Sequence, residues 1–177
     1  TFKIKKPRVF KGGVEFQASN RGFYQVLQWS RLANGLMLRL DQFRARDRVE
    51  LYNKTQRLDW SRYFKGALPV QVDSSSHESR LFGSGEIANT ITSAIRASLK
   101  EHKSKARVKA SEDKDTLSFR VHARIVDNQC TLSLDASGLK FYKRGWRKTV
   151  GKAPLRETTA QALLTLLGWK PGDVLVD

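Results

Sequence analysis

The sequence has few of the residues that form cross-links, metal centres or membrane spans. Cys130 is the only cysteine among 177 residues, so no disulfide can form within the chain and a thiolate metal cluster is excluded. No apolar run approaches the roughly 20 residues that a transmembrane helix needs. The longest candidate, residues 162–169, is interrupted by Thr165 and Gly168. Low cysteine usage is typical of a reducing compartment, and we expect a cytoplasmic protein without membrane contact.

Recognisable catalytic motifs are also scarce. The three histidines, at positions 77, 102 and 122, share no short metal-ligand spacing with one another or with an acidic residue. Residues 74–78 (SSSHE) contain the residue types of a hydrolase triad, but no G-x-S-x-G elbow surrounds them. Residues 83–85 (GSG) are more typical of a helix cap than of a phosphate loop. We therefore predict no catalytic residue and no metal ligand; His122 is expected on a surface and Cys130 in the core.

Positive charge is what the sequence has in excess. The chain carries 33 Lys and Arg against 17 Asp and Glu, a net charge of +16 with a pI near 10.3. Residues 1–70 contribute +10 and residues 139–157 contribute +6. Such an excess favours binding to a polyanion, chiefly nucleic acid, over a merely solvated basic surface.

Apolar periodicity predicts intermixed helices and strands, and therefore an α+β (mixed α/β) fold. The expected helices are residues 21–33, capped by Ser19-Asn20, and a segment capped by Asp47. A third is capped by Ser84 or Gly85 and has a stripe of Ile87, Ile91, Ala94, Ile95 and Leu99. The last has Pro154 in its first turn and a stripe of Ala160, Leu163, Leu164 and Leu167. The expected strands cover residues 9–16 (a hairpin turning at Gly12-Gly13), 36–43, 68–72, 117–125, 130–135 and 173–177, with a loop at 73–85 and a turn at Asp127-Asn128. Residues 139–146 are expected to be a further strand or an extended segment.

One short segment combines cations with aromatic rings. Residues 140–148 (KFYKRGWRK) hold five cations and three aromatic residues, which can supply phosphate contacts and stacking surfaces. The alternative is a sheet strand with buried aromatic side chains and a solvated cationic face. We call this segment the basic strip. The predicted RNA-binding residues are Lys140, Lys143, Arg144, Arg147, Lys148 and, outside the strip, Arg80.

Three segments resemble the bacterial 23S rRNA guanine-N2 methyltransferases that contain a THUMP domain. They are residues 12–16 (GGVEF) with the following helix and strand, residues 131–138 (TLSLDASG) running into residues 143–147 (KRGWR), and residues 153–158 (APLRET) followed by a Leu-rich helix and Gly168-Trp169. Their order and spacing cover nearly the whole chain. The pair Thr92-Ser93 departs from the family, where a Lys-Asp pair is common.

The resemblance implies three parts. Residues 1–57 would be a partial ferredoxin-like region, residues 58–150 a THUMP RNA-binding domain, and residues 151–177 the first helix and strand of a Rossmann-like methyltransferase domain that uses S-adenosylmethionine. Asp177 would match the acidic residue that opens the methyl-donor loop. The glycine-rich remainder of that loop is not in these 177 residues, so we expect a piece of a longer enzyme that transfers no methyl group by itself.

The implied function is to hold structured RNA, most simply rRNA, for methylation of a base exposed in a loop or flipped out of a duplex. Two alternatives remain open. One is a tRNA methyltransferase of the same superfamily, and the other is a stand-alone RNA-binding or assembly module without catalysis.

Overall fold

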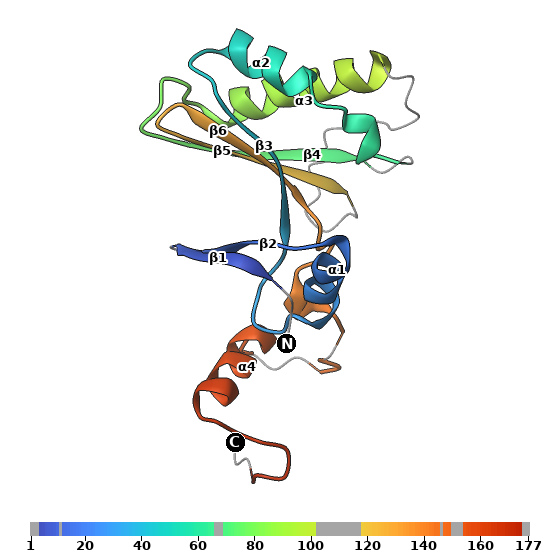
Figure 1. Cartoon of the computed structure of the whole chain (residues 1–177), viewed down its shortest axis with the longest axis vertical. Helices are drawn as coiled ribbons and strands as arrows, with labels where there is room; N and C mark the ends of the chain where they lie inside the picture. Colours follow the sequence, from blue (N-terminus) through green and yellow to red (C-terminus); the bar gives the residue numbers. More distant parts are fainter. Residues whose placement is uncertain are drawn as a thin grey trace. The chain divides into compact units, whose positions relative to one another are not determined.

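The computed structural model describes residues 4–10, 12–65, 69–101, 118–145, 147–149 and 154–174. These residues form the mixed α/β fold that the sequence predicts (Figure 1). Contacts divide the chain into two compact units. The terminal unit comprises residues 1–36 and 139–177, and the central unit comprises residues 37–138.

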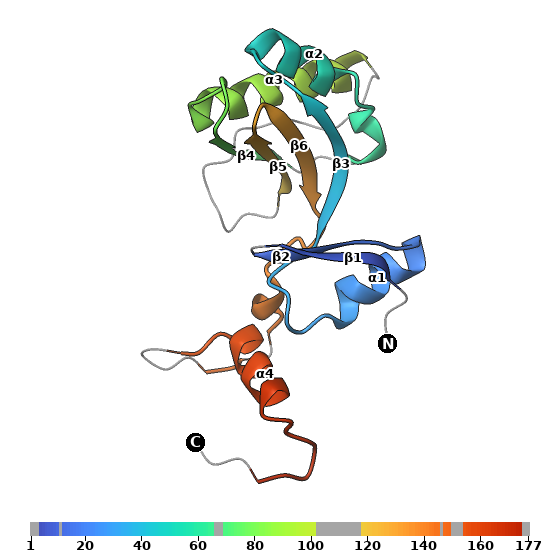
Figure 2. The ribbon, with the colours of Figure 1, turned by 60° about the vertical axis from the view of Figure 1, so that its left-hand side comes forward.

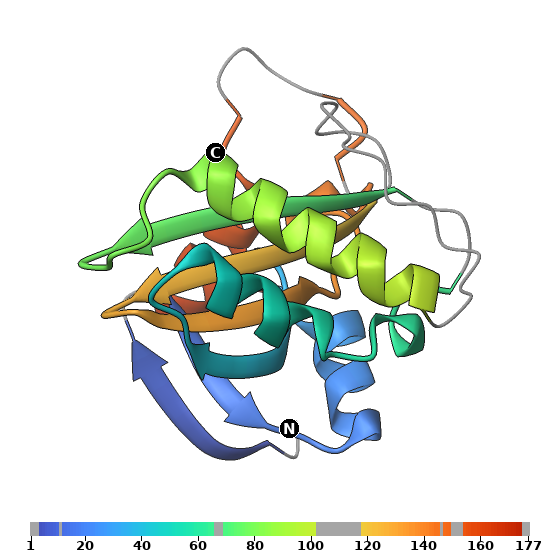
Figure 3. The same ribbon diagram turned by 90° about the horizontal axis from the view of Figure 1, so that it is seen from above.

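The central unit is a four-stranded sheet covered on one face by two helices. The strand order is β3 (Met37–Arg44), β6 (Gln129–Asp135), β5 (Phe119–Val126) and β4 (Val70–His77). The β4–β5 pair is parallel and the other pairs are antiparallel. Helices α2 (Arg48–Gln56) and α3 (Ser84–Glu101) run across the same face of the sheet (Figure 3). As predicted, the Asp47 carboxylate caps α2 by accepting a 2.8 Å hydrogen bond from the Glu50 N–H.

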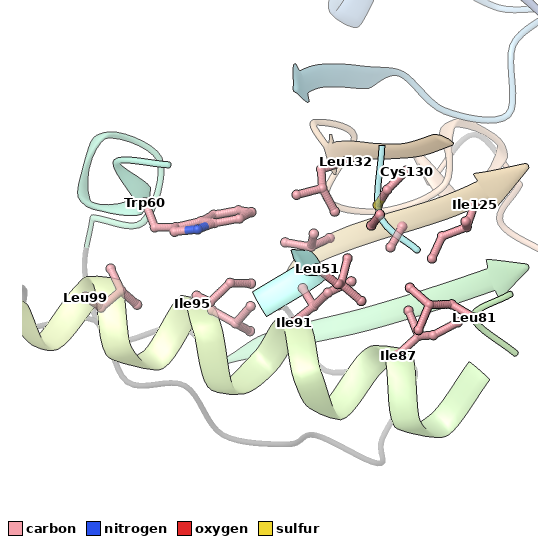
Figure 4. Close-up of a cluster of buried hydrophobic side chains, with 14 of the residues drawn as sticks. Leu51, Trp60, Leu81, Ile87, Ile91, Ile95, Leu99, Ile125, Cys130 and Leu132 are labelled. Carbon is pink, nitrogen blue, oxygen red and sulfur yellow. The ribbon is translucent and has the colours of Figure 1, made fainter. Parts of the chain in front are cut away.

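The core of the central unit lies between α3 and the sheet. The predicted stripe of α3 is confirmed: Ile87, Ile91, Ile95 and Leu99 are buried and face the strands (Figure 4). The 3₁₀ turn η1 (Trp60–Arg62) adds the Trp60 ring, which stacks on Phe64 with centroids 5.4 Å apart. Sequence periodicity did not identify this pair, because both rings lie outside any regular helix or strand.

The expectation of a loop over residues 73–85 is wrong for its first five residues, which belong to β4. The whole length of β4 pairs with β5, which supplies hydrogen-bond partners to the inward-facing backbone groups of this edge strand despite its polar sequence. The half-buried Ser74 and Ser76 donate hydroxyl hydrogen bonds to the Ser84 and Leu81 carbonyls. These serines therefore fasten an edge strand to the chain that leads into α3.

The terminal unit begins with the predicted hairpin, β1 (Lys5–Phe10) and β2 (Gly13–Gln17), seen from the side in Figure 2. Gly12 turns the chain with φ +94°, a conformation that favours glycine. Helix α1 (Asn20–Trp29) starts as predicted, since the Ser19 hydroxyl accepts from the Gly22 N–H at 3.2 Å. It ends at Trp29 rather than at residue 33, because Ser30 is extended (φ −66°, ψ 127°).

The expectation of a strand or extended segment over residues 139–146 is also wrong for residues 139–145, the part that the structure describes. The chain instead forms the 3₁₀ turn η2 (Phe141–Lys143). Burial decides this geometry: the Phe141 ring packs into a small cluster with Val26 and Leu36, and the Phe141 N–H donates to the Asn34 carbonyl at 3.0 Å. A strand would place successive side chains on opposite faces and would not allow this docking.

The expectation that Pro154 lies in the first turn of the last helix is wrong, because α4 (Glu157–Leu166) begins only after the extended N-cap Arg156 (φ −66°, ψ 141°). Gly168 follows the helix with φ +69°. Within the described chain only Thr158 of this helix is buried, and its hydroxyl donates to Asn34 Oδ1 at 3.1 Å. The predicted apolar stripe is left largely uncovered, with Leu163 48% and Leu167 79% exposed. Asp173 and Val174 are not in a strand; the rest of the expected final strand, residues 175–177, lies outside the described residues.

Candidate nucleic-acid interface

Arg144 connects the basic strip to the end of α1. Its guanidinium donates to the carbonyls of Gln28 at 3.0 Å, Ser30 at 3.1 Å and Leu27, and it lies 4.1 Å from the centroid of the Phe141 ring. The last carbonyls of a helix have no partner within the helix and carry partial negative charge. Arg144 satisfies these groups, while its side chain stays exposed.

Arg147 connects the strip to the start of α4. Its Nε lies 3.3 Å from the Glu157 carboxylate, and its guanidinium donates to the Leu155 carbonyl. The side chain is 29% exposed. Arg144 and Arg147 are thus both engaged within the terminal unit, and their predicted role in RNA contact stays a prediction.

The lysines of the strip are distributed around the η2 turn rather than along a strand. Lys143 and Lys148 are exposed and Lys140 is half-buried. Tyr142 lies under the guanidinium of Arg156, at 5.3 Å from its ring centroid. The alternating faces expected for a strand are therefore absent, and Trp146 lies outside the described residues.

Two exposed aromatic residues of α1 were missed by sequence analysis. Trp29 and Tyr24 of α1 are 58% and 65% exposed. Trp29 occupies the last turn of α1, between residues whose carbonyls Arg144 holds. A tryptophan just before a helix stop was the available signal, but only the tertiary fold places the basic strip beside it.

Charge is concentrated in this unit. Residues 1–36 and 139–177 together carry 15 Lys and Arg against 4 Asp and Glu, a net charge of +11. The central unit is larger but carries only +5. The terminal unit is therefore the stronger candidate for electrostatic attraction to a polyanion.

Arg80, the remaining predicted contact, lies in the central unit on the connection from β4 to α3. Its N–H donates to Asn128 Oδ1 at 2.9 Å, and the Asn128 N–H donates to the Ser79 hydroxyl at 3.0 Å. Asn128 and Asp127 form the predicted β5–β6 turn with φ of 61° and 49°. The Arg80 side chain is exposed, and Phe82 beside it is 80% exposed. The β4–α3 connection therefore exposes the Arg80 cation and the Phe82 ring, and its backbone is held by the hydrogen bonds to Asn128.

A shallow groove of about 580 Å³ runs between α2 and α3. Arg48 and Tyr52 line one side, and Glu86, Asn89 and Thr90 line the other. Arg48 and Glu86 form an ion pair across it. Because the two charges cancel, the groove has no excess positive charge to attract a phosphate.

Cys130 and His122, which the sequence did not favour as catalytic or metal-binding residues, both lie in the sheet of the central unit. Cys130 is fully buried, and burial, with a smaller contribution from Asp41, raises the pKa of its thiol to about 12. His122 is half-buried in β5, with Nδ1 3.8 Å from an Asp73 oxygen. Among the described residues there is no cluster of His, Cys, Asp and Glu that could hold a metal ion. Of the helices described, none is long and apolar enough to span a membrane.

The described part of residues 144–177 offers no cradle for S-adenosylmethionine. The helix α4 carries its apolar residues exposed, and the predicted ligand Asp177 lies outside the described residues.

Comparison with known proteins identifies the two regions. Residues 45–135 match the THUMP domain, and residues 144–177 match the RMKL-like methyltransferase domain. The chain belongs to the THUMP-domain family, and the matches lie in the order that the sequence resemblance implies.

The relatives are much longer than this chain. Proteins named ribosomal RNA large subunit methyltransferase K/L from Methylococcus capsulatus and Photobacterium profundum are 35% and 31% identical to it over 90% and 96% of its length. The chain spans only 21% and 24% of them. Solved structures can also be superposed on more than nine-tenths of this chain, although it covers less than half of each of them.

Three solved structures share that fold. A Listeria monocytogenes protein described as a predicted N6-adenine-specific DNA methylase superposes with a TM-score of 0.76 at 27% identity, over 92% of this chain and 42% of its own. A possible methylase from Clostridium difficile 630 gives 0.74 at 31% identity, over 93% and 42%. The protein SMU.472, complexed with SAH, gives 0.72 at 24% identity over 94% and 43%, which shows the fold only.

Proposed function

We propose that this chain is the RNA-binding N-terminal portion of an S-adenosylmethionine-dependent rRNA (guanine-N2) methyltransferase that acts in the cytoplasm. The chain grips structured RNA and delivers a base to the catalytic domain. The observation that carries the proposal is the succession of a THUMP domain and the start of a methyltransferase domain within one chain. The net charge of +16 supports a polyanionic partner.

The choice of rRNA rests on the names of the two K/L relatives, and the choice of cofactor on the SAH complex of a structural neighbour. The division into parts at residues 57 and 150 belongs to the same proposal. A tRNA methyltransferase and a non-catalytic RNA-binding module are the alternatives.

The proposal is tested by measuring binding of the 177-residue chain to a structured rRNA fragment at several salt concentrations. If phosphate contacts dominate, affinity falls by orders of magnitude between about 50 and 200 mM salt for 6–10 contacts. A tRNA and a DNA duplex of similar size serve as competitors. No binding at low salt, or a flat salt dependence, contradicts the proposal.

The site prediction is tested with charge variants of the strip. Changing Lys143 and Lys148 together to Ala is expected to lower the salt slope by about one to two units, since each lost phosphate contact removes roughly 0.7–0.9. Both lysines are exposed, and a urea unfolding curve of the variant verifies that the fold is preserved. The matched control is the double change of Arg57 and Lys65, which are also exposed but lie in the central unit. Equal slopes for the wild type and the strip variant would remove the strip from the binding site.

The double change of Arg144 and Arg147 to Ala is also expected to weaken RNA binding. Because both guanidinium groups hold backbone carbonyls within the unit, this variant is expected to lose stability as well. Its RNA affinity is therefore interpretable only beside a measured unfolding curve. Unchanged affinity and salt slope in a folded variant would assign both residues a structural role only.

The expected absence of catalysis is tested with S-adenosylmethionine and undermodified rRNA. A polypeptide of residues 1–177 is expected to transfer no methyl group, because the glycine-rich remainder of the methyl-donor loop is not among these residues. Turnover by this polypeptide would show that the assignment of residues 151–177 is wrong.

A further inference from the structure

We propose that Trp29 is a base-stacking residue, and that the terminal unit binds an unpaired stretch of RNA with a base on the Trp29 ring and phosphates on the adjoining basic strip. This inference rests on the proposed function and names the RNA conformation that the unit recognises. It assigns a role to a residue outside the basic strip.

The first observation is the exposure of the ring. Trp29 is 58% exposed although it lies only about 60° around α1 from the buried Val26, which with the half-buried Phe23 and Leu27 supplies the small core of the unit. Leaving a tryptophan in water gives up a large apolar burial. An exposed aromatic ring offers a face on which any of the four bases can stack.

The second observation is the position of cations relative to this ring. Arg144 holds the carbonyls of Gln28 and Ser30, the two residues that flank Trp29. Lys143, exposed, directly precedes Arg144 in the chain. The three hydrogen bonds of Arg144 also hold the last turn of α1 in place. The backbone that bears the Trp29 indole is therefore stabilised by a residue outside the helix.

The third observation is the excess of positive charge in the terminal unit, which indicates the kind of ligand that it binds. The unit carries 15 cationic side chains and 4 acidic ones, and one of the acidic groups, Glu157, is paired with Arg147. An apolar protein partner does not require this excess, whereas a phosphate backbone is attracted by it. A duplex would satisfy the cations but would keep its bases stacked and away from the ring. Aromatic rings and cations together are suited to single-stranded RNA.

The test uses the full 177-residue chain, a mixed-sequence 12-nucleotide single-stranded RNA and the 12-base-pair duplex of the same sequence. Trp29→Ala is expected to weaken single-strand binding by about 5- to 150-fold, the range found for loss of one base–aromatic stack. Duplex binding is expected to change less than about two-fold. The salt slope is expected to stay the same, since no phosphate contact is removed.

Variants separate stacking from a general apolar effect. Trp29→Phe keeps an aromatic face and is expected to retain most of the affinity, while Trp29→Leu keeps apolar bulk without that face and is expected to behave as Trp29→Ala. Tyr24→Ala is the matched control, because Tyr24 is exposed on the same helix but points about 140° away from Trp29 at 100° per residue. Lys143→Ala is expected to lower the salt slope for both RNAs.

The outcomes distinguish this inference from the proposed function. If the wild type binds neither RNA at low salt, the proposed function fails. If the wild type binds RNA and both Trp29→Ala and Trp29→Leu bind the single strand equally well, the stacking role is wrong and the ring serves another partner, such as a protein surface. An equal loss for single strand and duplex in a folded variant would also overturn it.

Discussion

At the scale of single residues, two of the four tryptophans show how tertiary position decides what a side chain does. Trp60 is fully buried, stacks on Phe64, and donates from Nε1 to the Thr55 carbonyl at 2.8 Å. Trp29 is more than half exposed. The same residue type therefore stabilises the central unit in one place and presents a surface in the other.

This contrast gives a prediction on stability. Trp60→Ala is expected to lower the free energy of unfolding by about 3–5 kcal/mol, because it leaves a cavity and removes a hydrogen-bond donor from a buried carbonyl. Trp29→Ala is expected to change it by less than about 1 kcal/mol. Urea denaturation followed by circular dichroism measures both. Similar losses for the two variants would show that Trp29 is also a core residue.

The buried thiol gives a second prediction. Burial raises the pKa of Cys130 from 9.0 to about 12, so the folded protein holds this proton at a pH where the unfolded chain releases it. The contribution to stability is present below pH 9 and is lost as the pH rises from 9 to 12. Accordingly, Cys130 is expected to stay unmodified by a thiol reagent at pH 8 and to react fully once the chain is unfolded in urea. Rapid reaction of the native protein would contradict its burial.

Among the elements, the β5–β6 turn is hydrogen-bonded to two other connections of the central unit. The Asn128 carbonyl accepts from the Ala45 N–H at 2.8 Å, its side chain accepts from the Arg80 N–H, and its own N–H donates to Ser79. One turn residue thus holds the β3–α2 and β4–α3 connections, including the one that carries Arg80.

Two substitutions separate the roles of Asn128. Asn128→Ala is expected to cost about 1–3 kcal/mol, since alanine disfavours the positive φ and the Arg80 N–H loses its acceptor. Asn128→Gly keeps the backbone conformation and is expected to cost less. Amide hydrogen exchange should accelerate at Arg80 in both variants, with the other bonds of the sheet as internal reference. Unchanged exchange at Arg80 would show that its protection has another source.

At the scale of the whole molecule, the two units differ in how the chain builds them. The central unit is one continuous segment with its own large core, whereas the terminal unit combines both ends of the chain around a small cluster. A continuous segment with a complete core has what independent folding requires.

We therefore expect residues 37–138 to fold alone and to unfold cooperatively in urea. Because this segment carries +5 of the +16 net charge, its RNA affinity is expected to depend less steeply on salt than that of the full chain. Dispersed amide signals in an NMR spectrum and a single unfolding transition would verify the first expectation. An equal salt slope for the segment and the full chain would contradict the second.

Local sequence patterns were sufficient to predict the mixed α/β class, the hairpin at Gly12-Gly13, the caps Ser19 and Asp47, and the apolar stripe of α3. Each of these depends on local chemistry: backbone freedom at glycine, an acceptor for unpaired helix N–H groups, or a 3.6-residue period. The charge excess and the resemblance to THUMP methyltransferases were also evident, and the family match confirms the latter.

Three features depend on tertiary contacts: the polar second half of β4, the 3₁₀ turn in the basic strip, and the place of the strip beside Trp29. In each case a contact distant in sequence outweighs local preference. The pairing with β5 makes Ser74–His77 a strand, burial of Phe141 beside Val26 and Leu36 bends the strip, and Arg144 reaches carbonyls more than a hundred residues away. Such contacts leave no periodic pattern in the sequence, because the residues that stabilise each segment lie far from it along the chain.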